Sequence, residues 1–372
     1  MKLLHAAAVL ALPVLAACIA ARQVPRRSAM AAAWDARGAA AYLDGRQGWW
    51  QTWPTASRDH GTSCVSCHTA LPYALSRPAL AGELHETESP AAERKLLDDV
   101  RTRAVLWKDV EPFYPDQTRG IPKTSESRGT EAVLNALILA VADARRGRAS
   151  DEGRAAFANM WALQFRSGDI SGAWAWLNFH LAPWESDDAT FFGATLAAVA
   201  VGTAPEEYAA RPELEPRLKL LREYLRRQAS TQGLYNRASL LWASSRLPGL
   251  LSAGERTAIV EALFSAQHAD GGWGMPSLGQ WKRSDGSTAD DASDGLATGF
   301  VSFAMQEAGL RANDSRIASS LAWLVQHQNR ATGQWTASSV NKKRDGNSDT
   351  GKFMSDAATA YAVLALTRTG VR

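Results

Sequence analysis

The chain has 372 residues, 46% of them hydrophobic, which is enough to bury a sizeable core in one large domain or two ordinary ones. Its 41 basic and 38 acidic residues nearly cancel, and this balance argues against a nucleic-acid-binding protein. No second long apolar stretch follows the N-terminal segment, so the sequence predicts no membrane-spanning helix in the mature chain.

The N-terminus has the pattern of an export signal. Lys2 precedes an apolar run that is too short to span a bilayer as a mature helix, and the run ends in Leu-Ala-Ala-Cys at residues 15–18. This ending resembles the lipobox of bacterial lipoproteins, which implies removal of residues 1–17 and lipidation of Cys18 at the periplasmic face of a membrane. Residues 18–29 would then form a tether. A conventional secretory leader, which would release a soluble periplasmic protein, is the alternative.

Cys64, Cys67 and His68 form a Cys-x-x-Cys-His motif, which is the attachment signature of a c-type haem. Each thiol adds to one vinyl group of the porphyrin, and His68 then lies where it can ligate the iron. A redox disulfide, half of a zinc site and chance are the alternatives. Zinc usually needs about four ligands, and the only other cysteine is Cys18. The motif therefore predicts one covalent haem c. Because haem c is assembled outside the bacterial cytoplasm, this prediction agrees with the export signal.

The rest of the chain alternates between two kinds of helical segment. Amphipathic, charged segments are expected to form outer helices, near residues 30–47, 90–107, 152–165, 212–228, 252–267 and 315–328. Runs that are apolar on nearly all sides are expected to form buried inner helices, starting near residues 68, 128, 187, 236, 294 and 356. Asp188, Asp294 and Asp356 open three of these runs, where we expect their carboxylates to cap the helices.

The loops between outer and inner segments carry a second repeat, in which a glutamine is followed by a glycine and an aromatic residue. Gln267 with Trp273 and Gln328 with Trp335 are the clearest cases. The pattern resembles the glutamine–tryptophan repeat of squalene–hopene cyclases and related terpenoid cyclases.

This resemblance covers roughly residues 150–370 well and the earlier part weakly. It implies an all-α fold, an (α/α)6 toroid of six outer and inner helical hairpins forming a single domain over residues 30–372. The haem motif would then lie at the start of the first inner helix, at the rim where the outer-to-inner loops gather.

Ring closure predicts the second iron ligand. If the last inner helix neighbours the first, Met354 lies level with the haem motif and is the first candidate for the distal ligand. A methionine that merely fills a gap in the core is the alternative. Met275, His60 and His180 are the next candidates, and an open distal face would indicate small-molecule binding or peroxide chemistry.

The predicted rim also gathers carboxylates. Terpenoid cyclases that protonate their substrate use an Asp-x-Asp-Asp-Thr-Ala motif, and the nearest match here is at residues 185–190. Glu185 replaces the first aspartate and the Thr-Ala order is reversed, so the match is incomplete around Asp187 and Asp188, the candidate catalytic acids. A glycosidase that uses paired carboxylates is a further interpretation of the toroid and its rim acids, but this activity would give the haem no role.

Together these features predict an exported, lipid-anchored c-type haem protein that acts in electron transfer or haem-dependent redox chemistry. The apolar lumen of the toroid would hold part of the haem or an apolar, isoprenoid-like molecule. The basic loop at residues 341–345 would dock an acidic periplasmic redox partner. A pure electron carrier is one alternative, and a non-redox terpenoid cyclase or lipid-binding protein with a structural haem is another.

Overall fold

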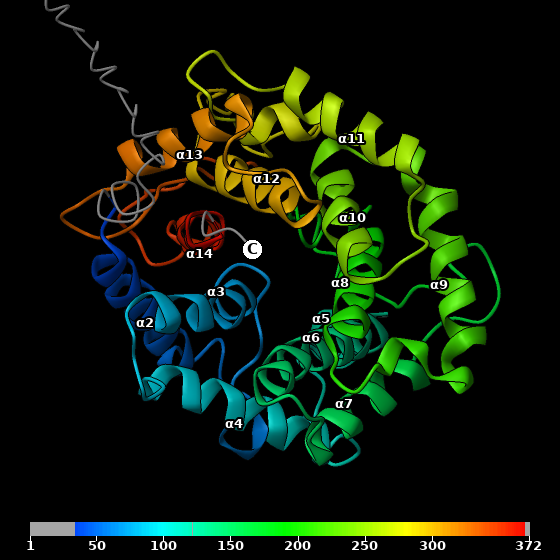
Figure 1. Cartoon of the computed structure of the whole chain (residues 1–372). Helices are drawn as coiled ribbons and strands as arrows, with labels where there is room; N and C mark the ends of the chain where they lie inside the picture. Colours follow the sequence, from blue (N-terminus) through cyan, green and yellow to red (C-terminus); the bar gives the residue numbers. More distant parts are fainter. Residues whose placement is uncertain (1–33, 121, 369–372) are drawn as a thin grey trace, which may run out of the picture.

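The computed structural model describes residues 34–120 and 122–368, and within these ranges the chain is helical with no β-strand. The helices form antiparallel hairpins that close into a ring (Figure 1). This confirms the predicted α/α toroid of six hairpins. The predicted signal peptide at residues 1–17, the lipidation site Cys18 and the tether at residues 18–29 lie outside the described residues.

An outer and an inner layer of helices alternate along the chain. The outer helices are α2 (Ala36–Thr52), α4 (Ala91–Val105), α7 (Asp151–Ala162), α9 (Glu215–Gln228), α11 (Ala253–Ser265) and α13 (Ser315–His327). The inner helices are α3 (Ala70–Glu83), α6 (Lys123–Arg146), α8 (Ala189–Thr203), α10 (Leu234–Arg246), α12 (Gly295–Glu307) and α14 (Phe353–Thr367). The loops contain the short helix α5 (Asp116–Arg119) and 3₁₀ turns at Asp59–Gly61, Tyr208–Ala210, Pro212–Leu214, Ala229–Thr231 and Met275–Leu278.

The two layers differ in how much of each helix is buried. The outer helix α9 buries Leu218, Leu221 and Leu225 along one face and leaves its charged side chains toward solvent. In contrast, α8 buries every residue from 191 to 201. A helix that is apolar all round is stable only inside a core, which explains why these runs form the inner layer. The inner ring is closed because α14 packs against both α12 and α3.

Aromatic side chains fill the space between the inner helices. The ring centroids of Tyr235 and Phe300 lie 4.7 Å apart, and those of Phe300 and Tyr361 lie 4.9 Å apart. All three side chains are fully buried. At this level the ring is therefore a packed core, and open space is found nearer its two ends.

The glutamine–tryptophan repeat ties neighbouring hairpins together. Gln267 Nε2 donates to the carbonyl oxygen of Gly271 at 2.8 Å in its own loop and to that of Arg316 at 3.1 Å in the next outer helix. Trp273 Nε1 donates to the carbonyl oxygen of Leu263 at 2.7 Å. Each motif thus satisfies backbone groups that the end of an outer helix leaves free.

The same bonds join the two ends of the ring. Gln328 Nε2 donates to the carbonyl oxygen of Asp35 at 2.9 Å, and Gln328 Oε1 accepts from the Asp35 backbone N–H at 2.6 Å. The last outer helix is thereby fixed to the start of the first. Gln51 plays a similar part in the first hairpin, where it donates to the carbonyl oxygen of Ala92 at 2.9 Å.

The expected capping by aspartates is correct at only one of the three positions. Asp294 accepts from the backbone N–H groups of Leu296 and Ala297, both at 2.9 Å, and caps α12. Asp188 lies at the N-cap position of α8, but its carboxylate accepts no hydrogen bond from the helix backbone. Asp356 lies inside the first turn of α14, because that helix begins three residues earlier than the apolar run indicates.

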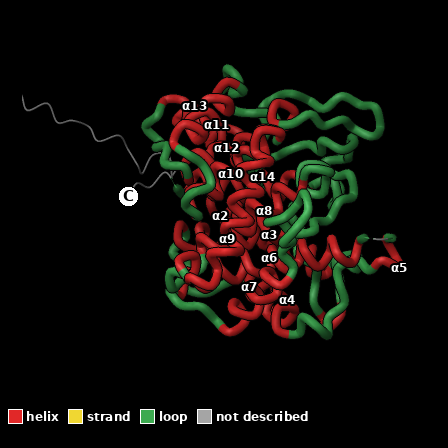
Figure 2. Tube along the Cα trace, turned by 90° about the vertical axis from the view of Figure 1, so that its right-hand side faces the viewer, coloured by secondary structure: helices red, strands yellow, loops and turns green. Residues whose placement is uncertain are grey.

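The outer-to-inner loops gather at one end of the ring, and Figure 2 shows these long loops in side view. The end of α14 lies toward the opposite end, since each inner helix leads away from the loop end. Within the described ranges, no helix combines the length and the apolar character that a bilayer crossing requires.

Candidate cofactor-binding site

A cavity of about 410 Å³ lies at the loop end of the ring. Three stretches of chain build most of its wall: residues 64–68 ahead of α3, residues 177–185 ahead of α8, and residues 339–354 leading into α14. Most of the lining is apolar, and its aromatic members are Trp50, Trp53, Phe113, Tyr114, Phe179, Trp184 and Phe353. The volume falls in the range of small-molecule and cofactor sites, which are usually concave and largely apolar.

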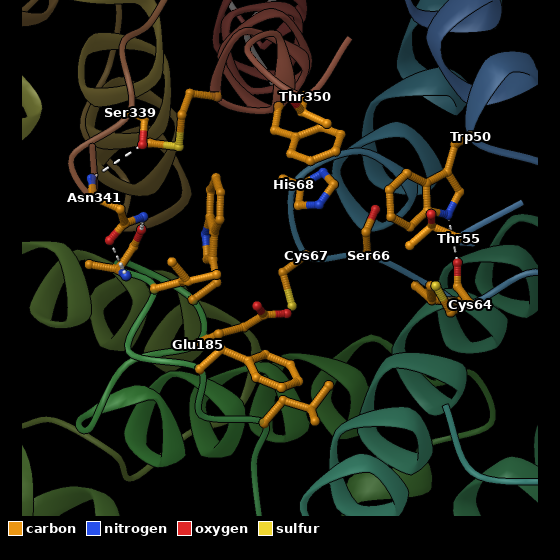
Figure 3. Close-up of a pocket in the computed structure, with 18 of the residues that line it drawn as sticks. Trp50, Thr55, Cys64, Ser66, Cys67, His68, Glu185, Ser339, Asn341 and Thr350 are labelled. Carbon is orange, nitrogen blue, oxygen red and sulfur yellow. Dashed lines mark hydrogen bonds between the residues drawn. The ribbon is translucent and has the colours of Figure 1, made fainter. Parts of the chain in front are cut away.

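The predicted haem-attachment residues come together on one side of this cavity (Figure 3). Cys64 and Cys67 are both buried, and neither forms a disulfide bond. Burial raises the pKa of the Cys64 thiol to about 11, and it raises the pKa of the Cys67 thiol well above its ordinary value. Both sulfurs are therefore held in a neutral form, whereas cysteines that exchange disulfides have a lowered thiol pKa.

The loop that carries the two cysteines is anchored to the first two outer helices. Trp50 Nε1, on α2, donates to the carbonyl oxygen of Cys64 at 2.7 Å. On α4, Asp99 Oδ2 accepts from the Ser63 hydroxyl at 2.8 Å, and Arg103 donates to the Thr62 hydroxyl at 3.1 Å. These partners are buried, so the backbone on which the thiols depend is held in a defined position.

The imidazole of His68 is held between two aromatic rings. Its centroid lies 3.8 Å from that of Phe353 in a stacked arrangement and 5.0 Å from that of Trp50 in an edge-on arrangement. Burial, with a smaller contribution from the positive charge of Arg46, lowers the pKa of His68 to about 3. The side chain is therefore neutral near pH 7, which is the form of histidine that binds metals.

A chain of hydrogen bonds decides which ring nitrogen is available. His68 Nδ1 lies 2.8 Å from Thr69 Oγ1, and the Thr69 hydroxyl donates to Asp356 Oδ2 at 2.7 Å. An ionised carboxylate only accepts, so Thr69 gives its proton to Asp356 and accepts the Nδ1 proton of His68. Nε2 is then the nitrogen left for a metal. We refer to His68, Thr69 and Asp356 as the His68 relay.

Two further groups hold the carboxylate of the His68 relay. Tyr42 Oη and Arg46 Nε each donate to Asp356 Oδ1 at 2.8 Å. Burial raises the pKa of Asp356, and the adjacent Arg46 guanidinium opposes this rise. Tyr42 and Arg46 lie on α2, Asp356 on α14, and Thr69 just ahead of α3, so the cluster sits where the ring closes.

Of the predicted distal candidates, the structure brings one to the cavity. Met354 is buried in the first turn of α14 and lines the same cavity as His68. Met275 is buried in a different part of the rim and lines a separate pocket. His60 and His180 are exposed and are not among the residues that line the cavity.

The two candidate catalytic acids lie on the surface. Asp187 is exposed, accepts from Asn178 and lies 3.0 Å from the His180 ring. Asp188 is also exposed, and its carboxylate accepts from the Ser186 hydroxyl. Neither lines the cavity, which takes only Glu185 from this acidic segment.

Glu185 faces the cysteines from across the cavity. Figure 3 shows its carboxyl group directed toward Cys67. Burial raises the pKa of Glu185 to about 7, with Lys123 acting in the opposite direction. Glu185 belongs to the incomplete acid motif, but no sequence pattern indicates that it faces a thiol.

Polar groups line the wall opposite the thiols. Ser339 and Asn341 lie across the cavity from Cys64 and Cys67 in Figure 3, and Arg344 lines the cavity from the same loop. We call Ser339, Asn341 and Arg344 the polar wall. The cavity thus has an apolar interior between a thiol-bearing side and a side that carries a cation and amide groups.

The His68 relay is the main feature that the sequence analysis missed. Asp356 was expected to cap a helix. The sequence nevertheless contains a signal that Asp356 lies near His68, because the repeat aligns the two residues at corresponding helix starts. In a closed ring, corresponding positions on neighbouring inner helices lie level with one another. Among residues 34–120 and 122–368, no three His, Cys, Asp or Glu side chains gather as they would around a metal ion.

Comparison with known proteins gives the fold. No protein-family model matches the chain, and no curated protein matches its sequence. Among solved structures, one described as a polysaccharide lyase has a TM-score of 0.53 at 10% sequence identity, and the match covers 90% of this chain and 96% of that chain. At this identity, the similarity shows that the chain shares a helical toroid fold with that protein.

Proposed function

We propose that this protein is a c-type haem protein, with one haem c joined to Cys64 and Cys67 and ligated by His68, that acts in electron transfer or haem-dependent redox chemistry. One observation carries the proposal. A neutral imidazole with Nδ1 already bonded, and Nε2 left for a metal, lies beside two free buried thiols on an apolar cavity.

The residues present fit such a group. The neutral sulfurs of Cys64 and Cys67 suit thioether bonds, which carry no charge, and His68 supplies the nitrogen that iron prefers. Arg344 on the polar wall would hold a porphyrin carboxylate. When bound, the haem would supply one-electron chemistry at a site that the aromatic walls screen from water.

Met354 is our candidate for the second axial ligand. It lines the same cavity and comes from α14, which packs against the helix that follows His68. A thioether ligand raises the reduction potential of a haem and suits an electron carrier. If no side chain fills this position, the open face would instead bind small molecules.

Export and partner binding belong to the same proposal. The leader at residues 1–17 would direct export and be removed, and lipid on Cys18 would hold the protein at the periplasmic face of a membrane. Lys342 and Lys343 are exposed next to Arg344 at the cavity, which supports an acidic redox partner. An apolar molecule in the lumen would have to bind near an end of the ring, because aromatic side chains pack the level of Tyr235 and Phe300.

Other activities have less support from this cavity. A polymer of sugars needs many polar contacts, whereas most of the residues that line the cavity are apolar. A terpenoid cyclase needs a shielded acid, and Asp187 and Asp188 are exposed. The toroid therefore indicates that this protein shares the architecture of those enzymes, and it is no support for their chemistry here.

Expression with a haem-attachment system tests the proposal. We expect the intact mass of the mature protein to include one haem that remains after denaturation, and a reduced-minus-oxidised spectrum typical of a c-type haem. The Cys64→Ala/Cys67→Ala variant should lose the covalent haem, whereas Cys18→Ala should keep it. A wild-type protein without the added mass, under conditions where control cytochromes acquire theirs, would overturn the proposal.

The distal ligand can be tested in the same preparation. We expect Met354→Ala to remove a methionine-to-iron absorption band that the wild type shows. Met275→Ala, at another buried methionine in a separate pocket, is the matched control and should retain the band. A band that survives in Met354→Ala would exclude this residue as the ligand.

A further inference from the structure

We propose that Asp356 lowers the reduction potential of the site by acting through the Thr69 hydroxyl on His68. The inference rests on the proposed haem function and assigns Thr69 and Asp356 as positioning residues for the iron ligand. It concerns the strength of His68 as a ligand, which the attachment motif alone does not determine.

The geometry of the His68 relay is that of a buried and continuous hydrogen-bond chain. The distances are 2.8 Å from His68 Nδ1 to Thr69 Oγ1 and 2.7 Å from Thr69 Oγ1 to Asp356 Oδ2. The exposed fractions of Thr69 and Asp356 are 3% and 1%. With water excluded, the charge at the end of the chain is poorly screened and polarises the bonds before it.

The relay ends in a carboxylate rather than in a neutral acceptor. A neutral acceptor would be enough to fix the tautomer and the orientation of the ring. An anion does more, because drawing the Nδ1 proton outward makes the opposite nitrogen a more basic ligand. A more basic ligand favours the more positively charged state of the iron, which is the oxidised state. The expected effect is therefore a lower potential, opposite to that of a thioether ligand.

The positive charge of Arg46 does not cancel this effect. Arg46 Nε bonds Asp356, while its Nη1 bonds Asp349 Oδ1 at 2.8 Å. One guanidinium is thus shared between two carboxylates, and the cluster keeps a net negative charge. Asp349 is half exposed and solvated, whereas Asp356 faces only its protein partners, so the buried end of the cluster acts on Thr69.

The test compares two variants of Thr69 in the haem-loaded protein. Thr69→Val keeps the shape of the side chain and removes the hydroxyl, while Thr69→Ser keeps the hydroxyl. We expect Thr69→Val to shift the oxidised–reduced equilibrium about tenfold toward the reduced form, which is about 59 mV in the midpoint potential for one electron. Thr69→Ser should keep the wild-type potential.

Asp356→Asn separates the charge from the orientation. The asparagine oxygen can still accept from Thr69, so the ring of His68 remains oriented while the charge is lost. We expect the potential to rise as in Thr69→Val. Proton exchange at His68 Nδ1, followed by NMR, should be faster in Thr69→Val and unchanged in Asp356→Asn. Tyr42→Phe removes one bond to the same carboxylate without touching its charge and is the matched control.

The outcomes distinguish this inference from the proposed function. Haem-loaded Thr69→Val with the wild-type potential would overturn the inference and leave the proposed function intact. A raised potential in Thr69→Val but not in Asp356→Asn would show that the relay only orients the ring, which also overturns it. A wild-type protein that carries no haem would instead overturn the proposed function. If Asp356→Asn does not fold, the wild-type potential in Thr69→Val would still overturn the inference.

Discussion

The starts of α12 and α14 have similar sequences, and the fold uses them differently. Each has an aspartate followed by an apolar run that contains a threonine, four residues after Asp294 and three residues after Asp356. Asp294 caps its own helix. Asp356 lies one turn inside its helix and bonds groups that precede α3 or lie on α2. The comparison shows that the aspartate of the repeat has two uses. Within the ring it caps its own helix, whereas at the closure of the ring it cross-links the two ends of the chain.

The largest expected difference between these two regions is in stability. Asp356→Ala should lower the free energy of unfolding by about 3 to 5 kcal/mol, because it leaves the buried Arg46 without its buried anionic partner. Asp294→Ala should cost about 1 to 2 kcal/mol, the usual value of a lost N-cap. Chemical denaturation of the two variants measures both values. Equal losses would show that the closing contact is no stronger than an ordinary cap.

The glutamine motifs should show the same contrast at a smaller scale. Gln328→Ala removes two hydrogen bonds to the backbone of Asp35 at the point of closure and one to its own loop. We expect it to cost about 2 to 3 kcal/mol, at about 1 kcal/mol for each bond. Gln267→Ala, within the ring, should cost about 1 kcal/mol less, because the third bond of Gln267, to Ser319 Oγ, is long at 3.4 Å. Thermal unfolding compares the pair, and a larger loss in Gln267→Ala would contradict the special role of the closing motif.

Measuring the free energy of unfolding over a pH series extends the comparison to Glu185, the acid that faces the thiols. Because burial raises the pKa of Glu185 to about 7, the folded state holds a proton that the unfolded state has released above pH 4.5. Glu185 therefore destabilises the protein increasingly as the pH rises from about 4.5 to 7, by at most about 1.4 kcal/mol per pH unit. Glu185→Gln should gain stability relative to wild type over this window.

The exposed Asp187 is the control for that series. Hydrogen bonding by Asn178 lowers the pKa of Asp187, so its effect on stability has the opposite sign. Asp187→Asn should show no gain relative to wild type as the pH rises. Comparing each variant with wild type at every pH cancels the contribution of His68, which titrates in part of the same range. A flat difference for Glu185→Gln would show that this carboxyl is solvated.

The third aspartate of the repeat should matter least. Asp188 occupies the N-cap position of α8, but its carboxylate makes no bond to the helix backbone and is exposed. Asp188→Ala should change the free energy of unfolding by no more than about 0.5 kcal/mol. A loss as large as that of Asp294→Ala would show that the carboxylate caps α8 in solution.

The ring was predictable because its signals are local and repeated. Apolar runs such as residues 189–201, amphipathic segments and the glutamine–tryptophan loops each identify one element, and their alternation defines the toroid. The motif around Cys64 and His68 is equally local. Met354 was expected near His68 because a closed ring places the last inner helix beside the first, and the two residues do line the same cavity.

The contacts of the site were not predictable in the same way. Thr69 and Asp356 are 287 positions apart, and Arg46 and Asp356 are 310 apart, so no spacing rule connects them. The role of Asp356 depends on where α14 begins, and packing against α3 at the closing contact decides that start rather than local propensity. Likewise, the place of Glu185 depends on the path of the loop before α8, which carries no periodic signal.

The closure of the ring at α14 has a consequence for how the protein is made. A chain synthesised from its N-terminus presents Cys64 and Cys67 long before Phe353 and Met354 exist, and these late residues complete the wall around His68. The wall of the cavity is therefore complete only after the final helix has docked, with Asp356 reaching Arg46. The last residues to be synthesised thus finish the site that the first hairpin begins.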